Sequence, residues 1–201
     1  MDVRNDRIAG GALVLAALIS MLAMAHHPSS AHALVLGRTV HGVMIAAVGV
    51  TVYGFAHLAI RRGIGDPAVL AGLVAYAIAA AANIGAATIN GFVVTALVER
   101  GPLNPGIARL AWEANQALAR LAVVAGGIAF LLWSLGFVRR RGLARPLGLL
   151  GIAAGLVPVA MLALGLRMNV AGAMLVYGIQ SAWIALAGLY LWSGRFAKEL
   201  G

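Results

Sequence analysis

The chain has 201 residues, of which 62% are hydrophobic and only 10% are charged. Soluble domains carry about 25% charged residues, so this composition excludes an ordinary water-soluble protein and predicts an integral membrane protein. The absence of cysteine excludes disulfides, iron–sulfur clusters, thiolate metal sites and a cysteine nucleophile. We attribute the net charge of +9 to loop arginines that set membrane topology, and we expect no nucleic-acid partner.

Six apolar segments are each long enough to cross a bilayer, which takes roughly 20 residues. They cover residues 8–25, 33–60, 67–97, 107–138, 147–166 and 170–192. Because lipid cannot satisfy open backbone groups, we expect every segment to be helical. The predicted fold is all-α: one domain, residues 1–201, that forms a bundle of six transmembrane helices.

The first segment ends in the stretch MLAMAHHPSS, which covers residues 21–30. Met21 and Met24 are spaced i,i+3, so they share one face of a helix, and His26 and His27 follow at its end. The end of this segment also imitates a secretory cleavage site, but we expect the segment to be retained as the first transmembrane helix.

The second segment repeats this pattern. His41 and Met44 have the same i,i+3 spacing, and their helix starts from the same short loop, which also carries His32. Imidazole and thioether ligands together suit copper, above all Cu(I), whereas two histidines on neighbouring helices suit a haem iron. The hairpin therefore predicts a copper site or a single haem b site at one membrane face. The alternative interpretation is that the histidines mark the membrane interface and the methionines fill the core.

We expect His27 and His41 to be the central pair of this site, because they lie at near-equal depth on helices that a short loop joins. His26, Met24 and Met44 are the further candidate metal ligands. Adjacent histidines project about 100° apart on a helix, so only one of them can point at His41. The sequence leaves open which of the two it is.

The remaining histidine of the second segment belongs to no such site. His57 is 16 residues from His41, which places it about 24 Å further along a helix and on nearly the opposite face. This separation argues against an electron conduit with two haems.

Polar residues recur on the third, fourth and sixth segments. Asn83 and Asn90 are seven residues apart and share a helix face with Tyr76. The candidates for a polar cavity at membrane depth are Asn83, Asn90, Glu113, Gln116, Arg120 and Gln180. The alternative is that these side chains only bond across helices, a contribution of roughly 1 kcal/mol each.

The fourth segment carries a polar stripe formed by Arg109, Glu113, Gln116 and Arg120. We expect Glu113 to pair with Arg109, which lies four residues before it. Arg120 then needs an acceptor on another helix, bound water or an anionic ligand, unless it reaches the outer interface. Among the six acids of the chain, only Glu113 is expected at membrane depth.

The fifth segment carries Gly148, Gly151 and Gly155, a spacing that favours close helix packing in lipid. Two turn-forming clusters, GDP at 65–67 and GPLNPG at 101–106, separate the second, third and fourth segments. Because all connections are short, we expect consecutive helices to be antiparallel neighbours.

The basic residues predict the orientation of the bundle. Six spans place both termini on one side, and ten of the fifteen basic residues lie there, against four on the other side: Arg4, Arg7, Arg61, Arg62, Arg139, Arg140, Arg141, Arg145, Arg195 and Lys198 against Arg38, Arg100, Arg109 and Arg167. The excess of positive charge marks the cytoplasmic side. We therefore expect a bacterial inner-membrane protein with both termini cytoplasmic, and the His26–His41 hairpin facing outward.

Four sequence runs resemble those of uncharacterised bacterial six-span integral membrane proteins: NDRIAGGALVL, INGF, LLWSLGF and YGIQSAWIALAGLYL. The resemblance covers most of the chain and implies a six-helix bundle. It implies no activity and no catalytic residue, and the AMAHHP stretch lies outside the pattern.

Three functions fit these observations. The first is a membrane protein that binds copper or one haem b at the outward-facing His/Met site. The second is a non-enzymatic accessory or interaction subunit whose partners are membrane lipids and other membrane subunits. The third is a carrier of a small or lipophilic solute that uses the region of Asn83 and Arg120.

Overall fold

The computed structural model describes residues 3–28 and 33–196, and these residues form helices and turns without any strand. Six of the helices are long and apolar enough to cross a membrane: α1 (Val3–Ala25), α2 (Leu34–Arg62), a third span from Pro67 to Glu99, α5 (Pro105–Val138), α6 (Ala144–Ala163) and α7 (Val170–Trp192). The predicted all-α bundle of six helices is confirmed. His32 and Lys198 lie outside the described residues.

The third span is made of three pieces. An α-helix, α3 (Pro67–Thr88), runs directly into a π-helical segment, η1 (Ile89–Val94), and the span ends in a short α4 (Thr95–Glu99). Such π-helical insertions are rare and are frequently found at functional sites.

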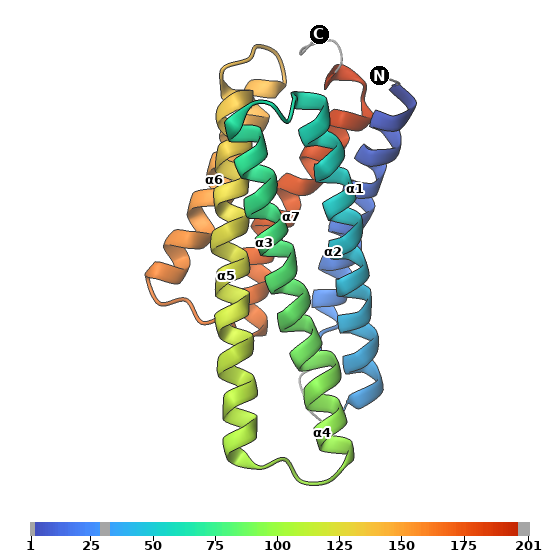
Figure 1. The fold of residues 1–201 in the computed structure, drawn as a ribbon, viewed down its shortest axis with the longest axis vertical. Helices are drawn as coiled ribbons and strands as arrows, with labels where there is room; N and C mark the ends of the chain where they lie inside the picture. The colour runs from blue at the N-terminus through green and yellow to red at the C-terminus, as the bar shows by residue number, and fades with distance from the viewer. Residues whose placement is uncertain (1–2, 29–32, 197–201) are drawn as a thin grey trace.

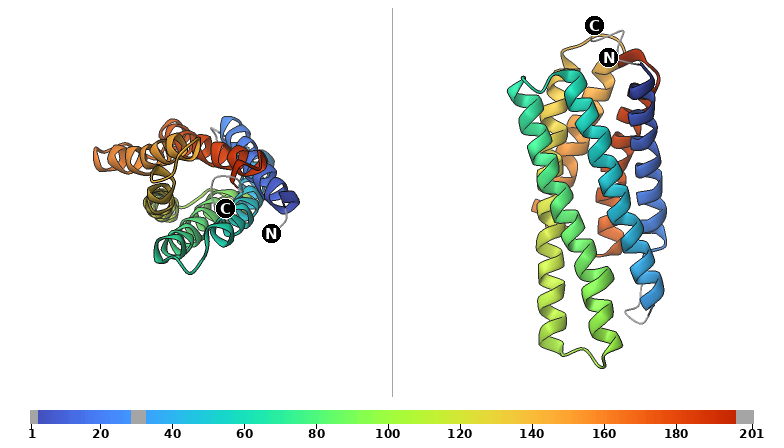
Figure 2. Two further views of the ribbon diagram at one scale, coloured as in Figure 1. Left: turned by 90° about the horizontal axis from the view of Figure 1, so that it is seen from above. Right: turned by 45° about the vertical axis from the view of Figure 1, so that its right-hand side comes forward.

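Each long helix packs against the helix before it, and α1 also packs against α7 (Figures 1 and 2). The prediction that consecutive helices are neighbours is confirmed. Two helices depart from an even bundle: α6 leans outward from the others, and the pair formed by α4 and the start of α5 extends beyond them (Figure 1).

The helices share two ends. The start of α1, the end of α7 and the α2–α3 and α5–α6 turns lie together at one end, which we call the arginine end (Figure 1). It carries Arg61, Arg62, Arg139, Arg140, Arg141, Arg145 and Arg195. The opposite end holds the end of α1 and the start of α2, and we call it the histidine end after His26, His27 and His41.

The predicted turns begin their helices with ordinary capping chemistry. The side chain of Asp66 accepts a hydrogen bond from the backbone N–H of Ala68, and Pro67 occupies the first helical position of α3. Asn104 caps α5 in the same way, again with a proline directly after it. Proline suits this position because its missing N–H would have no partner within the helix.

An aromatic layer occupies the middle of the bundle. Five rings from α2, α3, α5 and α7 pack together with centroids 4.6–6.2 Å apart: Phe55, Tyr76, Phe130, Trp133 and Trp183. The indole N–H of Trp133 donates to the carbonyl of Val69, and that of Trp183 donates to the carbonyl of Leu147. Both indoles are thus fully buried with their one polar group satisfied, as buried tryptophans require.

Glycines bring α5 and α6 into backbone contact. A Cβ added to Gly155 would lie 2.7 Å from the carbonyl oxygen of Gly127, and one added to Gly148 would lie 2.6 Å from the backbone nitrogen of Val138. The close packing predicted from the glycine spacing of the fifth segment is confirmed. No larger residue fits at either position without moving the two helices apart.

A buried ion cluster joins α1 to α2 near the arginine end. Asp6 is completely buried, and its Oδ1 accepts a hydrogen bond from Nε2 of His57 at 2.8 Å and lies 2.9 Å from Nε of Arg61. The Phe196 ring lies 5.6 Å from the Arg61 guanidinium. Asp6 is thus buried within the bundle, although the sequence analysis expected no acid other than Glu113 at membrane depth, and Glu113 itself is exposed on the surface of the bundle.

Replacing the carboxylate of this cluster should destabilise the protein strongly. We expect Asp6→Asn to lower the free energy of unfolding by about 3–5 kcal/mol, because Arg61 is then left buried beside His57 without an anion. Unfolding in mixed detergent micelles measures the effect. Asp66→Asn is the matched control: it makes the same chemical change at an exposed cap that asparagine fills equally well, so it should change stability by less than about 0.5 kcal/mol. Equal stability of the two variants would contradict the account.

Candidate functional site: a histidine pair above a methionine-lined cavity

The structure brings His27 and His41 together at the histidine end. His27 lies just beyond the end of α1 and His41 lies two turns into α2. Their ring centroids are 4.9 Å apart, and the rings meet edge to face with an angle of 74° between their planes. The two residues that the sequence analysis placed at the centre of a site are therefore in direct contact.

Backbone hydrogen bonds fix which nitrogen of each imidazole is free. Nδ1 of His41 lies 2.7 Å from the carbonyl oxygen of Gly37, and Nδ1 of His27 lies 3.1 Å from that of Pro28. A carbonyl oxygen only accepts, so each Nδ1 carries the proton and each Nε2 keeps its lone pair. Metal-binding histidines typically have this arrangement, because the second nitrogen is anchored by a hydrogen bond.

The adjacent histidine, His26, bonds to its own helix instead. His26 is exposed, and its Nδ1 lies 2.8 Å from the carbonyl oxygen of Leu22, on the preceding turn of α1. His26 thus stays on its own helix while His27, which precedes Pro28 and has left the helix, contacts His41. The structure thereby answers the question that the sequence left open.

The π-helical segment η1 packs directly against His41. A Cβ added to Gly91 would collide with Cβ of His41, so only glycine permits this approach. One turn later, Thr95 donates to the carbonyl of Gly91 and receives a hydrogen bond from Arg38, which also pairs with Glu99. These contacts hold the start of α2, and with it His41, against the third span.

A cavity of about 200 Å³ lies beside the histidine pair. Its lining contains two imidazoles, three thioethers and several neutral polar groups, together with alanines and one valine: Met24, His27, His41, Met44, Asn83, Ala86, Ala87, Trp112, Asn115, Ala119, Met168, Asn169, Val170, Ala173 and Tyr177. Met24 and Met44, which were predicted as further ligands, thus line the same cavity as the histidine pair. No acidic or basic side chain other than the two histidines is part of this lining.

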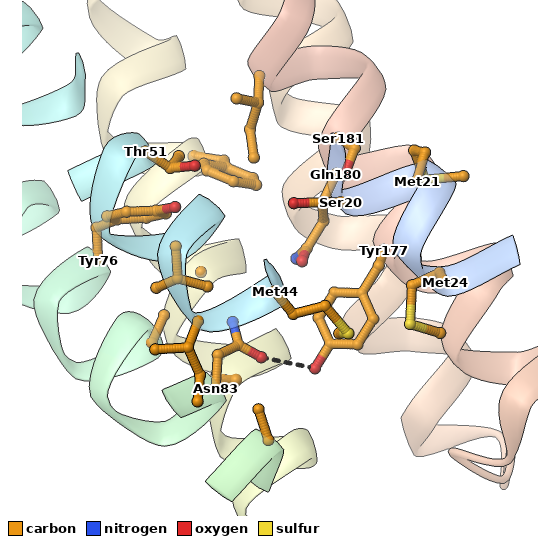
Figure 3. Close-up of a pocket in the computed structure, with 18 residues that line it drawn as sticks. Ser20, Met21, Met24, Met44, Thr51, Tyr76, Asn83, Tyr177, Gln180 and Ser181 are labelled. Carbon is orange, nitrogen blue, oxygen red and sulfur yellow. Dashed lines mark hydrogen bonds between the residues drawn. The ribbon is translucent and has the colours of Figure 1, made fainter. Parts of the chain in front are cut away.

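A second cavity of about 90 Å³ continues toward the middle of the bundle (Figure 3). Met24, Met44, Asn83, Ala87 and Tyr177 line both cavities, so the two are adjoining parts of one interior space. Between them the hydroxyl of Tyr177 donates to Oδ1 of Asn83 at 2.8 Å.

The inner cavity ends at the aromatic layer. Its innermost lining includes Tyr76 and Phe130, whose rings belong to that layer, together with Thr51. The space therefore reaches from the histidine pair to the centre of the bundle, and the packed rings separate it from the arginine end.

The polar candidates divide into two groups. Asn83 and Gln180 line the inner cavity, as Figure 3 shows. Gln116 is buried but donates to the carbonyl of Met168, and Asn90 is half-buried within η1.

The charged residues of the predicted stripe lie elsewhere. Glu113 and Arg120 are both exposed and neither lines the two cavities. The expected ion pair of Glu113 with Arg109 is absent from the salt bridges of the described residues. Arg120 thus does not share the cavity of Asn83.

Sequence reasoning missed three residues of the site. Met168 is buried and comes from the α6–α7 turn, while Asn115 donates to the carbonyl of Ala86 and Trp112 adds part of the cavity wall. The one sequence signal for Asn115 was its position directly before Gln116, a member of the polar stripe. Nothing in the spacing of the chain pointed to Met168.

The geometry distinguishes between the two cofactors that the sequence suggested. Two imidazoles that bind one ion at about 2 Å and at a roughly tetrahedral angle have ring centroids about 5 Å apart. Two imidazoles on opposite sides of a haem iron have centroids about 6 Å apart and need the whole macrocycle between them. The observed 4.9 Å fits a single ion, and a cavity of about 200 Å³ is small for a macrocycle.

The described residues contain no group of three or more His, Cys, Asp and Glu side chains arranged around one point. A metal ion here would therefore rely on the two imidazoles and on the thioethers of the cavity lining. Comparison of the chain with protein-family models, curated proteins and solved structures found no match. The functional conclusion rests on the geometry of the site.

The contact between Gly91 and His41 predicts a sharp difference between two glycine variants. Gly91→Ala should displace His41 from His27, because the added methyl would collide with Cβ of His41. Gly49→Ala is the matched control, since nothing lies within 4 Å of a Cβ added there. Histidine-selective NMR should show a ring-to-ring nuclear Overhauser effect between His27 and His41 in the wild type and in the control. Its persistence in Gly91→Ala would refute the role of η1.

Proposed function

We propose that this chain is an integral membrane protein of the bacterial inner membrane that binds one copper ion, as Cu(I), at its histidine end. His27 and His41 supply nitrogen ligands through Nε2, and Met24 and Met44 supply the thioethers. The observation that carries the proposal is the contact of the two imidazoles, 4.9 Å between centroids, at the edge of a cavity that both methionines line.

The charge of the site favours Cu(I) over other biological metal ions. Carboxylates suit Mg²⁺, Ca²⁺ and Mn²⁺, and Zn²⁺ usually takes thiolate, carboxylate or additional histidine ligands. The cavity beside His27 and His41 offers imidazole and thioether groups beside neutral amide, indole and phenol groups, and its lining has no carboxylate. Soft thioethers select Cu(I), a monovalent cation that needs no anionic ligand.

The shape of the two cavities favours the binding of a ligand over the passage of a solute through the bundle. The interior space extends inward from the histidine pair and ends at Tyr76 and Phe130 of the aromatic layer. A carrier of a small solute would need a path past these rings. An accessory subunit without a cofactor is the remaining alternative, and it requires no nitrogen or sulfur ligands in this cavity.

Copper titration tests the proposal. Purified protein in detergent, titrated with Cu(I) in competition with a chromophoric chelator, should bind one equivalent. His41→Ala and His27→Ala should abolish binding, whereas Met24→Leu and Met44→Leu should weaken it with little change in packing volume. His26→Ala is the matched control, because His26 is exposed and bonded to its own helix; this variant should bind copper normally.

Two outcomes contradict the proposal. One is wild-type protein that takes up no copper under these conditions. The other is equal loss of copper in His26→Ala and His41→Ala, which would place the metal outside the cavity. A Soret band in protein purified from haem-supplemented cells would instead assign the pair to haem b.

The orientation of the bundle follows from the arginines. We infer that the arginine end is cytoplasmic, because ten of fifteen basic residues belong to that side. A reporter that is active only in the periplasm should give no signal when fused after Gly201 and a strong signal when inserted directly after Pro28. The reverse pattern would place the histidine pair in the cytoplasm and contradict an outward-facing copper site.

A further inference from the structure

A groove of about 440 Å³ lies between α6 and α7 at the arginine end, far from the histidine pair. Seven of its nine lining residues are apolar or aromatic: Leu143, Pro146, Leu147, Leu150, Leu186, Leu189 and Tyr190. Ser193 and Arg195 complete the lining, beyond the end of α7. The groove is thus apolar along the helices and basic at its outer end.

The shape of the bundle creates this groove. Leu147 and Tyr190 are buried and form its floor, while Leu143, Leu186 and Leu189 are 40–48% exposed and form its walls. The α6 wall from Leu143 to Leu150 extends for about 10 Å along the helix. The groove lies at the start of α6, at the end of the helix that belongs to the arginine end.

The charge at the end of the groove is positive and has no counter-ion among the described residues. Arg195 is exposed and forms no ion pair with any residue in the ranges 3–28 and 33–196. Four further exposed arginines belong to the same end of the bundle without lining the groove: Arg139, Arg140 and Arg141 before α6, and Arg145 in its first turn. No acidic side chain lines the groove.

We propose that an anionic phospholipid occupies this groove, with its phosphate bound to Arg195 and one acyl chain lying along the leucines of α6 and α7. A guanidinium binds phosphate through charge-assisted, bidentate hydrogen bonds. Basic pockets between transmembrane helices on the cytoplasmic side bind anionic lipid headgroups in this manner. Leucines that line such a groove are as apolar as the chain they contact, so the headgroup provides the selectivity.

Native mass spectrometry tests the site. Protein in detergent, mixed with phosphatidylglycerol, should retain one lipid, and phosphatidylcholine at the same concentration should be retained much less. Arg195→Ala should weaken retention of phosphatidylglycerol by about tenfold or more, the loss expected for hydrogen bonds between charged groups. Arg109→Ala is the matched control, because Arg109 is an exposed arginine of the histidine end; it should retain the lipid normally.

A second variant tests the apolar part of the site. Leu186→Trp fills the groove and leaves Arg195 in place, so it should also reduce lipid retention. Unchanged retention in this variant or in Arg195→Ala would overturn the proposal, as would equal retention of phosphatidylcholine. Excess inorganic phosphate should not displace the lipid; if it does, the arginine binds free anions and the groove is not a lipid site.

Discussion

The two tryptophan hydrogen bonds at the centre of the bundle govern the rest of its architecture. Trp133 and Trp183 each donate to a backbone carbonyl of a neighbouring helix, and this fixes the positions of five packed rings from four helices. Lipid offers no partner for an indole N–H, so these two bonds remove the cost of burying the polar group of each indole. The aromatic layer then divides the molecule: a cavity with histidines and methionines lies on one side, and a zone of paired charges lies on the other.

The two sides satisfy their polar groups in different ways. Near the arginine end, Oδ1 of Asp6 lies against His57 and Arg61, which makes a charged junction between α1 and α2. At the histidine end, His27 and His41 each use Nδ1 for a backbone carbonyl, and Nε2 of each has no hydrogen-bond partner among residues 3–28 and 33–196. An ion cluster of this kind fastens helices together, whereas an imidazole pair beside thioethers is suited to a ligand.

Hydropathy was enough to predict the six helices, and helix geometry was enough to predict that one of the adjacent histidines His26 and His27 would meet His41, because depth and spacing follow from the rise of an α-helix. The contact of His57 with Asp6 could not be predicted in this way, since it depends on how α1 rotates against α2. The π-helical segment could not be predicted from the sequence either, although it contains Gly91, which packs against His41. The polar stripe of α5 was expected to need partners within the bundle, but only Gln116 is buried there, while α5 turns Glu113 and Arg120 to its exposed face.

X-ray absorption spectroscopy at the copper edge tests the central claim most directly, because it reports the elements bound to the metal. Protein loaded with one equivalent of Cu(I) should show two nitrogen neighbours, from His27 and His41, and at least one sulfur neighbour from Met24 or Met44. The chain contains no cysteine, so any sulfur signal must come from a methionine. Copper bound by nitrogen and oxygen alone, with no sulfur neighbour, would contradict a site in the methionine-lined cavity.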